Sequence, residues 1–361
     1  MGCYDPGKNV SRLLRPVVAI LLGCLVLTRD ASAQQNLAFA LFERYLEPLR
    51  QQAGIPGLSA AIVSDGAVVW ERGFGLQDIE RSIAASPDTV YPILGLTQTV
   101  ASTLALQCVD RDDLSLGDMV HRWSAQVPDG VTVQSVLNHT WGADGFRFDP
   151  ERFGRLTPVL EDCGDRPLPT LLLERVFERA VMFDTVPGRD LGDPGTPARQ
   201  LFDGAVLERF GRALGRMAAP YRVDRAGKAT RADFAVSGVN AATGLLSTVR
   251  DLAKFDRALS DGVLVDRSLL NEAWTNPVSA SGSALPSGMG WFVQQYNGER
   301  VIWQFGVERD AFSSLVVKIP RRNLTLILLA NSDGLSASFP LANGDVTTSV
   351  FAQLFLRTFV S

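Results

Sequence analysis

The chain has 361 residues, of which 46% are hydrophobic and 20% are charged, and its net charge at pH 7 is −4. This length predicts one large domain or two closely packed domains with a full hydrophobic core. The balanced composition excludes disordered, collagen-like and disulfide-rich proteins, and the acidic net charge disfavours nucleic-acid binding. Two histidines and four scattered cysteines do not make the spacings of a zinc site, so we expect no metal and no cofactor.

Residues 1–33 have the layout of a secretory signal peptide. Basic residues precede an apolar run over residues 17–27, and the small residues 31–33 offer a cleavage site before Gln34. We therefore predict a secreted or periplasmic product without a transmembrane segment in the mature chain. The alternative is a lipoprotein anchored through Cys24, whose preceding residues loosely resemble a lipobox, although Cys24 lies in the middle of the apolar run.

The remaining chain opens with a helical pattern over residues 37–50, in which Pro48 is expected to kink or shorten the helix. Two apolar runs, Leu58–Val63 and Ala67–Arg72, then flank Asp65-Gly66. Such a dipeptide between strand-like runs predicts a β-hairpin with a two-residue turn.

Residues 94–234 are mostly helical and loop-like in pattern. Apolar residues recur every three to four positions over 171–183 and 201–214, as in amphipathic helices. Cys108 lies in an apolar helical segment, where it is either a buried small hydrophobe or the disulfide partner of Cys163. The sequence leaves these alternatives open, because it does not give the distance between the two residues.

Strand patterns return from about residue 286. Asn297-Gly298 separates Trp291–Tyr296 from Glu299–Trp303, which is a strong hairpin signal. Pro320–Asn323 is a further turn between apolar runs, and Ser349–Phe359 predicts a final amphipathic helix.

Strands at both ends with helices between them predict an α+β fold. We expect one antiparallel sheet built from both termini, flanked by N- and C-terminal helices, with an inserted all-helical domain. The predicted domains are a sheet domain of residues 34–93 plus 235–361 and a helical domain of residues 94–234.

Six short motifs then carry a resemblance, because they occur together and in one order. They are Ile55-Pro56-Gly57-Leu58-Ser59 with the hairpin and Gly73-Phe74-Gly75, Leu137-Asn138-His139-Thr140, Gly244-Leu245-Leu246-Ser247-Thr248, Asp251-Leu252-Ala253-Lys254-Phe255, Gly288-Met289-Gly290-Trp291 and Leu328-Leu329-Ala330-Asn331. With them, the chain resembles the class C β-lactamases and penicillin-binding-protein-like serine hydrolases from about residue 37 to 357. The resemblance implies a sheet domain and a helical domain with the active site between them.

The resemblance also implies four catalytic side chains, and this sequence departs at each position. The family begins acyl transfer with a serine at a helix N-terminus and a lysine three residues later on the same helical face. Gly95 aligns with that serine and Gln98 with that lysine. Glycine has no nucleophile and glutamine is no base, and nowhere in the chain does a serine lie three residues before a lysine.

The family's tyrosine loop and its cationic strand triplet are changed too. After Pro187-Gly188, the tyrosine position aligns loosely with Asp193, and no tyrosine occurs between Tyr91 and Tyr221. The strand triplet reads Gln304-Phe305-Gly306, without the lysine or histidine that would hold a substrate carboxylate.

The resemblance still implies one part of the family's site, namely its backbone hydrogen-bond donors. Amides near Gly95, at the start of a helix, and the amide of Val307 resemble an oxyanion hole for an anionic or carbonyl group. Arg309 is a candidate to replace the lost cation. The candidate binding cleft comprises Gly95, Gln98, Thr99, Gln304, Phe305, Gly306, Val307 and Arg309.

The other polar residues near this cleft have plainer interpretations. The hydroxyls of Thr97, Thr99 and Ser102 are expected to pack rather than to act as displaced nucleophiles. His139 is interpreted as structural, and Glu308 and Asp310 as solvated carboxylates.

Two functions follow as hypotheses. The first is a secreted, non-catalytic homologue that binds a peptide, a cell-wall fragment or a protein partner through the residual cleft. The second is an active hydrolase of β-lactams, esters or peptides that uses displaced residues. The joint loss of serine, lysine, tyrosine and cation favours the first.

Overall fold

The computed structural model describes residues 1–2, 37–142, 145–235 and 238–360. The predicted signal peptide, apart from its first two residues, lies outside the described residues, and so does Cys24. Within the described part, no helix is both long and apolar enough to cross a bilayer.

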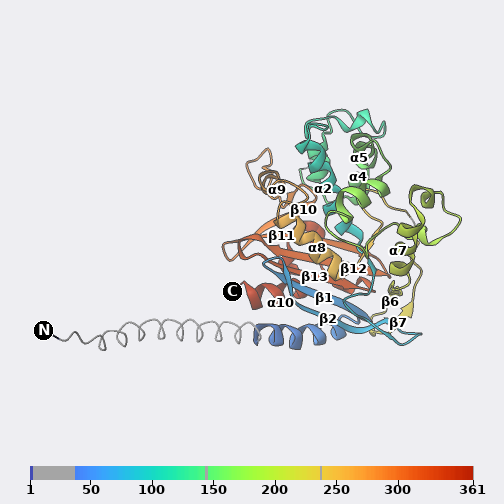
Figure 1. Cartoon of the computed structure of the whole chain (residues 1–361), viewed down its shortest axis with the longest axis vertical. Coiled ribbons are helices and arrows are strands. Elements are labelled where there is room, and N and C mark those ends of the chain that lie inside the picture. Colours follow the sequence, from blue (N-terminus) through green and yellow to red (C-terminus); the bar gives the residue numbers. More distant parts are fainter. Residues whose placement is uncertain (3–36, 143–144, 236–237, 361) are drawn as a thin grey trace.

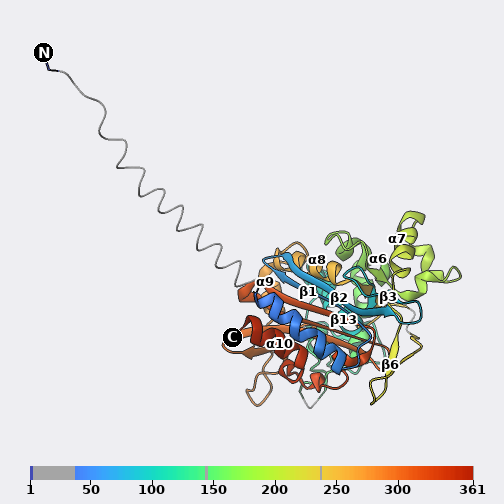
Figure 2. The same ribbon diagram turned by 90° about the horizontal axis from the view of Figure 1, so that it is seen from below.

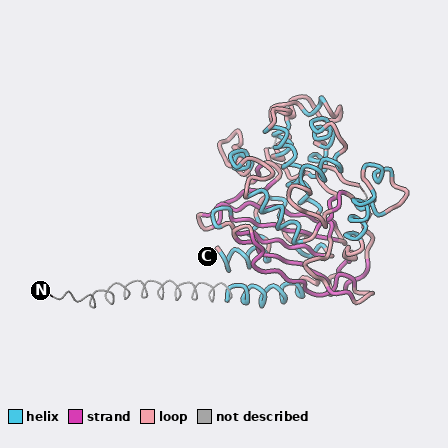
Figure 3. Tube along the Cα trace, viewed as in Figure 1, coloured by secondary structure: helices cyan, strands magenta, loops and turns pink. Residues whose placement is uncertain are grey.

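An eight-stranded antiparallel sheet in the order β3-β2-β1-β13-β12-β11-β10-β9 forms the centre of the molecule (Figure 3). Its strands are β1 (Gly57–Ser64), β2 (Ala67–Asp78), β3 (Ile83–Ala84), β9 (Ser287–Gly288), β10 (Trp291–Tyr296), β11 (Glu299–Glu308), β12 (Phe312–Ile319) and β13 (Leu324–Ala330). The sheet is built from both ends of the chain, as the sequence predicts.

The predicted hairpin turns are confirmed. Ser64 pairs with Ala67 across Asp65-Gly66, and Tyr296 pairs with Glu299 across Asn297-Gly298. All four turn residues have positive φ, between 48° and 77°, as a type I′ turn requires. These turns fix the register of both hairpins, and with it the face to which each side chain points.

Two helical layers cover the sheet (Figure 1). On one face lie the N-terminal helix, residues 37–52, and α10 (Val350–Phe359), which run side by side across the strands (Figure 2). Phe39 and Phe42 contact Phe359 across that pair, with ring centroids 5.6 and 5.7 Å apart. One apolar core lies on this face, and another lies on the opposite face, against α2 (Thr97–Asp110) and α8 (Val249–Ser260).

The helices on that second face come mostly from the middle of the chain. They are α2 (Thr97–Asp110), α3 (Val133–Leu137), α4 (Pro150–Gly154), α5 (Thr157–Gly164), α6 (Leu168–Leu172), α7 (Gly204–Leu214), α8 (Val249–Ser260) and α9 (Arg267–Ala273). A small sheet, β4 (Tyr91–Pro92), β8 (Leu245–Ser247) and β5 (Val186–Pro187), joins three distant segments, and β6 (Tyr221–Val223) pairs with β7 (Ala229–Arg231). The domain boundaries stay predictions.

The Cys108–Cys163 alternative is decided by the structure, which joins α2 to α5 through a disulfide with Cα atoms 6.3 Å apart. Cys108 is also buried, so both interpretations of this residue apply.

Some helix ends differ from the sequence expectation. The N-terminal helix continues through Pro48 to residue 52 and is not shortened. The helix predicted from the apolar pattern over residues 171–183 ends before Phe183. Helix α6 passes into a π-helical turn, Leu173–Phe177, and Val181 then has a φ of 60°, which a helix does not permit. Asp203 caps α7 by accepting from the amide of Val206, so this helix begins after the predicted start of its pattern.

Candidate functional site

The turn that leads into α2 packs directly against strand β11. A short 3-10 turn, Leu94–Leu96, precedes the helix, and Leu94 has a φ of 54°, a strained conformation for a branched residue. The hydroxyl of Ser314 on β12 donates to the carbonyl oxygen of Ile93 at 2.8 Å. This bond fixes the turn against the sheet.

Gly95 lies too close to β11 to carry a side chain. A Cβ atom at position 95 would lie 2.3 Å from the carbonyl oxygen of Phe305, and one at Gly306 would lie 2.7 Å from the amide nitrogen of Gly95. Real Cβ atoms do not approach backbone this closely. Position 95 therefore holds no nucleophile and has no room for one unless the strand moves.

Gln98 is fully buried and bonded to His139. The amide of Asp149 donates to Nδ1 of His139 at 3.2 Å, so Nδ1 accepts and the ring proton is on Nε2. Nε2 therefore donates to Oε1 of Gln98, 2.9 Å away. Burial lowers the pKa of His139 to about 3, so the ring is neutral.

The bond to His139 also fixes which way the Gln98 amide points. With Oε1 toward the ring, Nε2 points away from it and has no hydrogen-bond partner among the described residues. A buried donor without a partner costs about 1–3 kcal/mol. Gln98, which the sequence alignment assigns to the family's lysine position, thus holds a neutral donor with unused hydrogen-bonding capacity.

Gln304, which the sequence alignment assigns to the position of the family's cation, is hydrogen-bonded to its surroundings. Its Nε2 donates to the carbonyl oxygen of Gly290 at 3.1 Å, and its Oε1 accepts from the amide of Phe305 at 2.9 Å. The side chain is buried, so it supports the backbone rather than facing solvent.

Strand alternation places the neighbours of Gln304 on the other face of the sheet, as expected. The ring of Trp303 stacks on Phe292 with centroids 4.2 Å apart, and Phe305 contacts Phe148 at 5.1 Å. Both belong to the core beneath α10. Phe305 thus contributes its carbonyl, not its ring, to the contact with Gly95.

The displaced-hydroxyl candidates are all buried and bonded. Thr99 donates to the carbonyl oxygen of Leu96 at 2.8 Å, and Ser102 donates to that of Met289 at 2.7 Å. Thr97 accepts from the amide of Leu245 at 3.4 Å. Each hydroxyl is therefore part of the hydrogen-bonded, packed interior, as the sequence analysis expects.

The loop after β5 (Val186–Pro187) begins beside the candidate site. Pro187 pairs with Leu245, the residue whose carbonyl accepts from the amide of Ile93, so the loop begins close to the entrance of α2. Asp193 bonds to its own loop, accepting from the amide of Gly195 at 2.9 Å. Burial raises the pKa of the nearby Asp190.

The exposed part of the site is the end of β11. Val307, Glu308 and Arg309 are exposed, and partial burial raises the pKa of Glu308. Strand β10 pairs with β11 only as far as Trp303, whereas β12 continues to Glu308. One edge of this strand end is therefore left without a strand partner among the described residues.

Sequence reasoning did not find the Gln98–His139 pair or the aromatic contacts of Phe148. His139 was identified as structural, but its partner lies 41 residues away. The sequence carries no local signal for this pair, because the two residues belong to separate motifs and the motif of His139 was interpreted as structural.

Comparisons with known proteins show the family and the fold that this chain resembles. A sequence model described as Beta-lactamase matches residues 42–347. Protein flp of Staphylococcus aureus (strain N315) is 29% identical over 126 residues, 32% of this chain and 23% of that protein. A Beta-lactamase of Providencia stuartii is 28% identical over 143 residues, 38% of this chain and 36% of that protein. The matched part thus spans well under two thirds of these relatives.

Solved structures extend the likeness over most of the chain. The octameric penicillin-binding protein homologue from Pyrococcus abyssi has a TM-score of 0.67 at 20% identity, covering 88% of this chain and 76% of that one. The D-alanine carboxypeptidase AmpC from Burkholderia cenocepacia also has a TM-score of 0.67, at 18% identity, covering 88% and 99%. Identities this low show a shared fold.

Proposed function

Because the chain belongs to the Beta-lactamase family, we propose that it is a member without acyl-transfer activity, which binds a peptide or peptide-like cell-wall fragment beside β11. The observation that carries the proposal is the contact between Gly95 and the Phe305 carbonyl, which leaves no space for a nucleophile.

The side-chain chemistry at the site also supports the absence of acyl-transfer activity. Acyl transfer needs a nucleophile and a base to activate it, and removing either from a comparable hydrolase lowers the rate by about 10⁶. Here the base position, Gln98, is a neutral amide bonded to a neutral imidazole. The buried hydroxyls of Thr99 and Ser102 both donate to backbone carbonyls.

The binding surface follows from the free end of β11. Peptide groups of alternate residues in a strand point the same way, so those of Val307 are directed like those of Phe305, toward the Gly95 side. An extended peptide adds to such an edge through main-chain hydrogen bonds. The exposed Arg309 would pair with a ligand carboxylate.

Export is part of the same proposal. The signal pattern over residues 1–33, with cleavage before Gln34, would deliver the protein to the compartment where cell-wall fragments occur. N-terminal sequencing of the protein recovered from the cell exterior or periplasm tests this. A chain that begins at Gln34 supports cleavage, and one that begins at a lipid-modified Cys24 supports the anchored form.

The decisive experiment is intact mass spectrometry of the purified chain after incubation with excess penicillin and with an activated ester. We expect no adduct and no ester turnover above a heat-denatured control. A stable adduct would overturn the proposal, and peptide mapping would then identify the nucleophile, with Thr99 and Ser102 tested first.

Binding is tested by thermal denaturation with a soluble peptidoglycan digest, since a ligand that binds the folded state raises the melting temperature. We expect a rise that Arg309→Gln reduces and that the exposed control Arg321→Gln, on another turn, leaves unchanged. No rise with any fraction of the digest would contradict the binding half of the proposal.

A further inference from the structure

The N-terminal helix carries a second apolar stripe, which points away from the sheet. Leu37, Leu41 and Tyr45 recur every four residues, and they are 60%, 39% and 56% exposed. Pro48, one turn further on, is exposed as well. We propose that this side of the molecule lies on an anionic lipid bilayer, with these side chains inserted among the lipid headgroups.

The stripe is not needed to hold the helix on the sheet. Phe42 and Leu46 are fully buried and already attach the helix, with partly buried Phe39 and Leu49 packed beside them. A helix that only covers a sheet is apolar on one side and polar on the other. Single exposed apolar residues are common on protein surfaces, but a continuous stripe over three turns indicates a second apolar environment.

Helix α10 extends this surface. It lies beside the N-terminal helix on the same face of the sheet, and Phe359 near its end contacts Phe39 and Phe42 (Figure 2). Its exposed residues are Val350 and Arg357, seven positions and thus two turns apart, so both point the same way. Because the two helices form one layer, their outward sides form one surface, which we call the outer face.

The exposed charges of the outer face are positive and unpaired. Arg44 and Arg357 are its exposed charged residues. Among the described residues, the ion pairs of the two helices involve other arginines, since they are Arg50–Glu47 and Arg72–Glu43. Helix α10 contains no acidic residue. An arginine without a carboxylate partner is free to bind the phosphate of a lipid headgroup.

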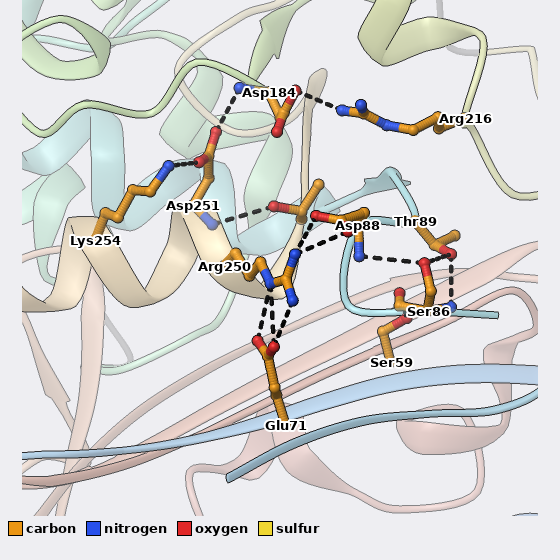
Figure 4. Close-up of polar contacts among 11 residues, drawn as sticks. Ser59, Glu71, Ser86, Asp88, Thr89, Asp184, Arg216, Arg250, Asp251 and Lys254 are labelled. Atoms are coloured by element: carbon orange, nitrogen blue, oxygen red, sulfur yellow. Dashed lines mark hydrogen bonds and ion pairs between the residues drawn. The ribbon is translucent and has the colours of Figure 1, made fainter. Parts of the chain in front are cut away.

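Cations of α8, on the other face of the sheet, are paired instead (Figure 4). Arg250 bonds to Glu71 through Nε at 3.0 Å and to Asp88 through Nη1 at 2.7 Å. Lys254 donates to the buried carboxylate of Asp251 at 2.8 Å. Because the whole chain has a net charge of −4, its attraction to an anionic surface depends on where unpaired cations lie. The outer face combines such cations with exposed apolar side chains.

The position of the helix in the chain brings it to the bilayer. The apolar run over residues 17–27 ends ten positions before Leu37. Under the export proposed above, that run enters the membrane, so the outer face emerges beside it. A chain cut before Gln34 begins three residues ahead of Leu37, and its α-ammonium group adds a cation there. In the anchored form, a lipid on Cys24 would hold the helix at the same surface. Delivery to the bilayer rests on the proposed function, whereas the chemistry of the outer face does not.

A contact of this size holds the protein reversibly. Even a myristoyl chain binds a bilayer with an association constant of only about 10⁴ M⁻¹, and the outer face offers a few partly exposed side chains. Binding therefore needs the apolar contacts and the cations together. A symmetric pair of copies would bring the same cations face to face, so charge favours an anionic bilayer over a second copy of the chain.

Sedimentation with lipid vesicles tests the proposal, using the chain from Gln34 onward, which contains all described helices and strands. We expect binding to vesicles of phosphatidylglycerol that weakens as the salt concentration is raised. Binding to vesicles of phosphatidylcholine should be on the order of tenfold weaker or less, because these vesicles carry no net charge.

A double variant tests the apolar stripe. Leu41→Gln with Tyr45→Gln should weaken binding on the order of tenfold or more, since both side chains lose their contact with lipid. Leu201→Gln with Val278→Gln is the matched control, because these residues lie outside the two helices and are similarly exposed, 38% and 67%. The control should bind as the wild-type chain does.

A second pair of variants tests the cations. Arg44→Glu should weaken binding on the order of tenfold. Arg225→Glu makes the same change of charge at an exposed turn residue and should have little effect. Thermal unfolding confirms that each variant is folded. As a readout of position, brominated lipids should quench the fluorescence that Tyr45→Trp adds and not the fluorescence that Leu201→Trp adds.

No binding to phosphatidylglycerol, equal binding to both lipids, or equal effects of the test and control variants would overturn the proposal. Self-association that is lost in Leu41→Gln with Tyr45→Gln, without any vesicle binding, would assign the outer face to a second copy and would overturn it too. The same double variant should keep the response to the peptidoglycan digest. Failure of this proposal and failure of the proposed function are therefore distinguishable.

Discussion

Nε2 of His139 donates to Oε1 of Gln98 across 2.9 Å, and this bond joins a loop of the helical region to the first turn of α2. Because Nδ1 already accepts from the amide of Asp149, the imidazole has one tautomer available and presents a donor to residue 98. A lysine has no acceptor to offer it. The pocket is therefore suited to glutamine and not to the lysine that the sequence alignment would place there.

Restoring the lysine should consequently destabilise the protein. Gln98→Lys would bury an ammonium beside an N–H donor, and an uncompensated buried charge costs about 3–5 kcal/mol. Urea denaturation measures the loss. Gln134→Lys, on the exposed side of α3, is the control and should change the unfolding free energy by less than about 0.5 kcal/mol. Equal effects of the two variants would contradict the pairing.

Acid should destabilise the fold through His139. Its pKa is about 3 in the folded state against 6.5 for an unperturbed histidine, so between these values the unfolded chain takes up a proton that the folded chain does not. Stability therefore falls as pH drops below about 6.5, by up to about 1.4 kcal/mol per pH unit from this group. Above about pH 6.5 the ring is neutral in both the folded and the unfolded state, so this loss of stability is absent.

Denaturation midpoints measured from pH 7 to pH 4 check this. His139→Gln removes the titrating group and should flatten the dependence, whereas His121→Gln, a partly exposed histidine, should leave it steep. Parallel curves for the wild-type chain and His139→Gln would show that other groups control acid unfolding.

A serine at position 95 should not restore activity. Gly95→Ser places Cβ against the Phe305 carbonyl, and overpacking of this kind costs about 1–3 kcal/mol. Gly95→Ala separates the steric effect from the hydroxyl. Gly211→Ala is the control, since a Cβ there meets open space within α7 and should stabilise the helix by about 0.5–1 kcal/mol. Ester turnover by Gly95→Ser would show that β11 moves enough to make room for the serine side chain.

The sequence predicts local features of this fold well because their causes are local. Asp65-Gly66 and Asn297-Gly298 determine their turns through the backbone conformations that they permit. Pro48 does not shorten the N-terminal helix, because a helix tolerates proline where packing of the surrounding turns outweighs the lost hydrogen bond.

One contact of the candidate site was predictable, since motif alignment brings Gly95 and Gly306 together and the structure places them in contact. The detail of the site was not. The distance between η1 (Leu94–Leu96) and β11, and the partner of Gln98, depend on contacts between segments 41 to about 210 residues apart. No local pattern encodes such separations.

The disulfide should contribute strongly to stability. It closes a loop with a sequence separation of 55 residues between α2 and α5, and the chain-entropy relation gives about 4 kcal/mol for a loop of this length. Reductant should therefore lower the unfolding free energy of the wild-type chain by an amount of this order. Cys108→Ala with Cys163→Ala should show the lowered stability without reductant and no further response to it. These are the only cysteines after residue 33, so in the chain from Gln34 onward a response that persists in the double variant would mean that the reductant acts on something other than a disulfide.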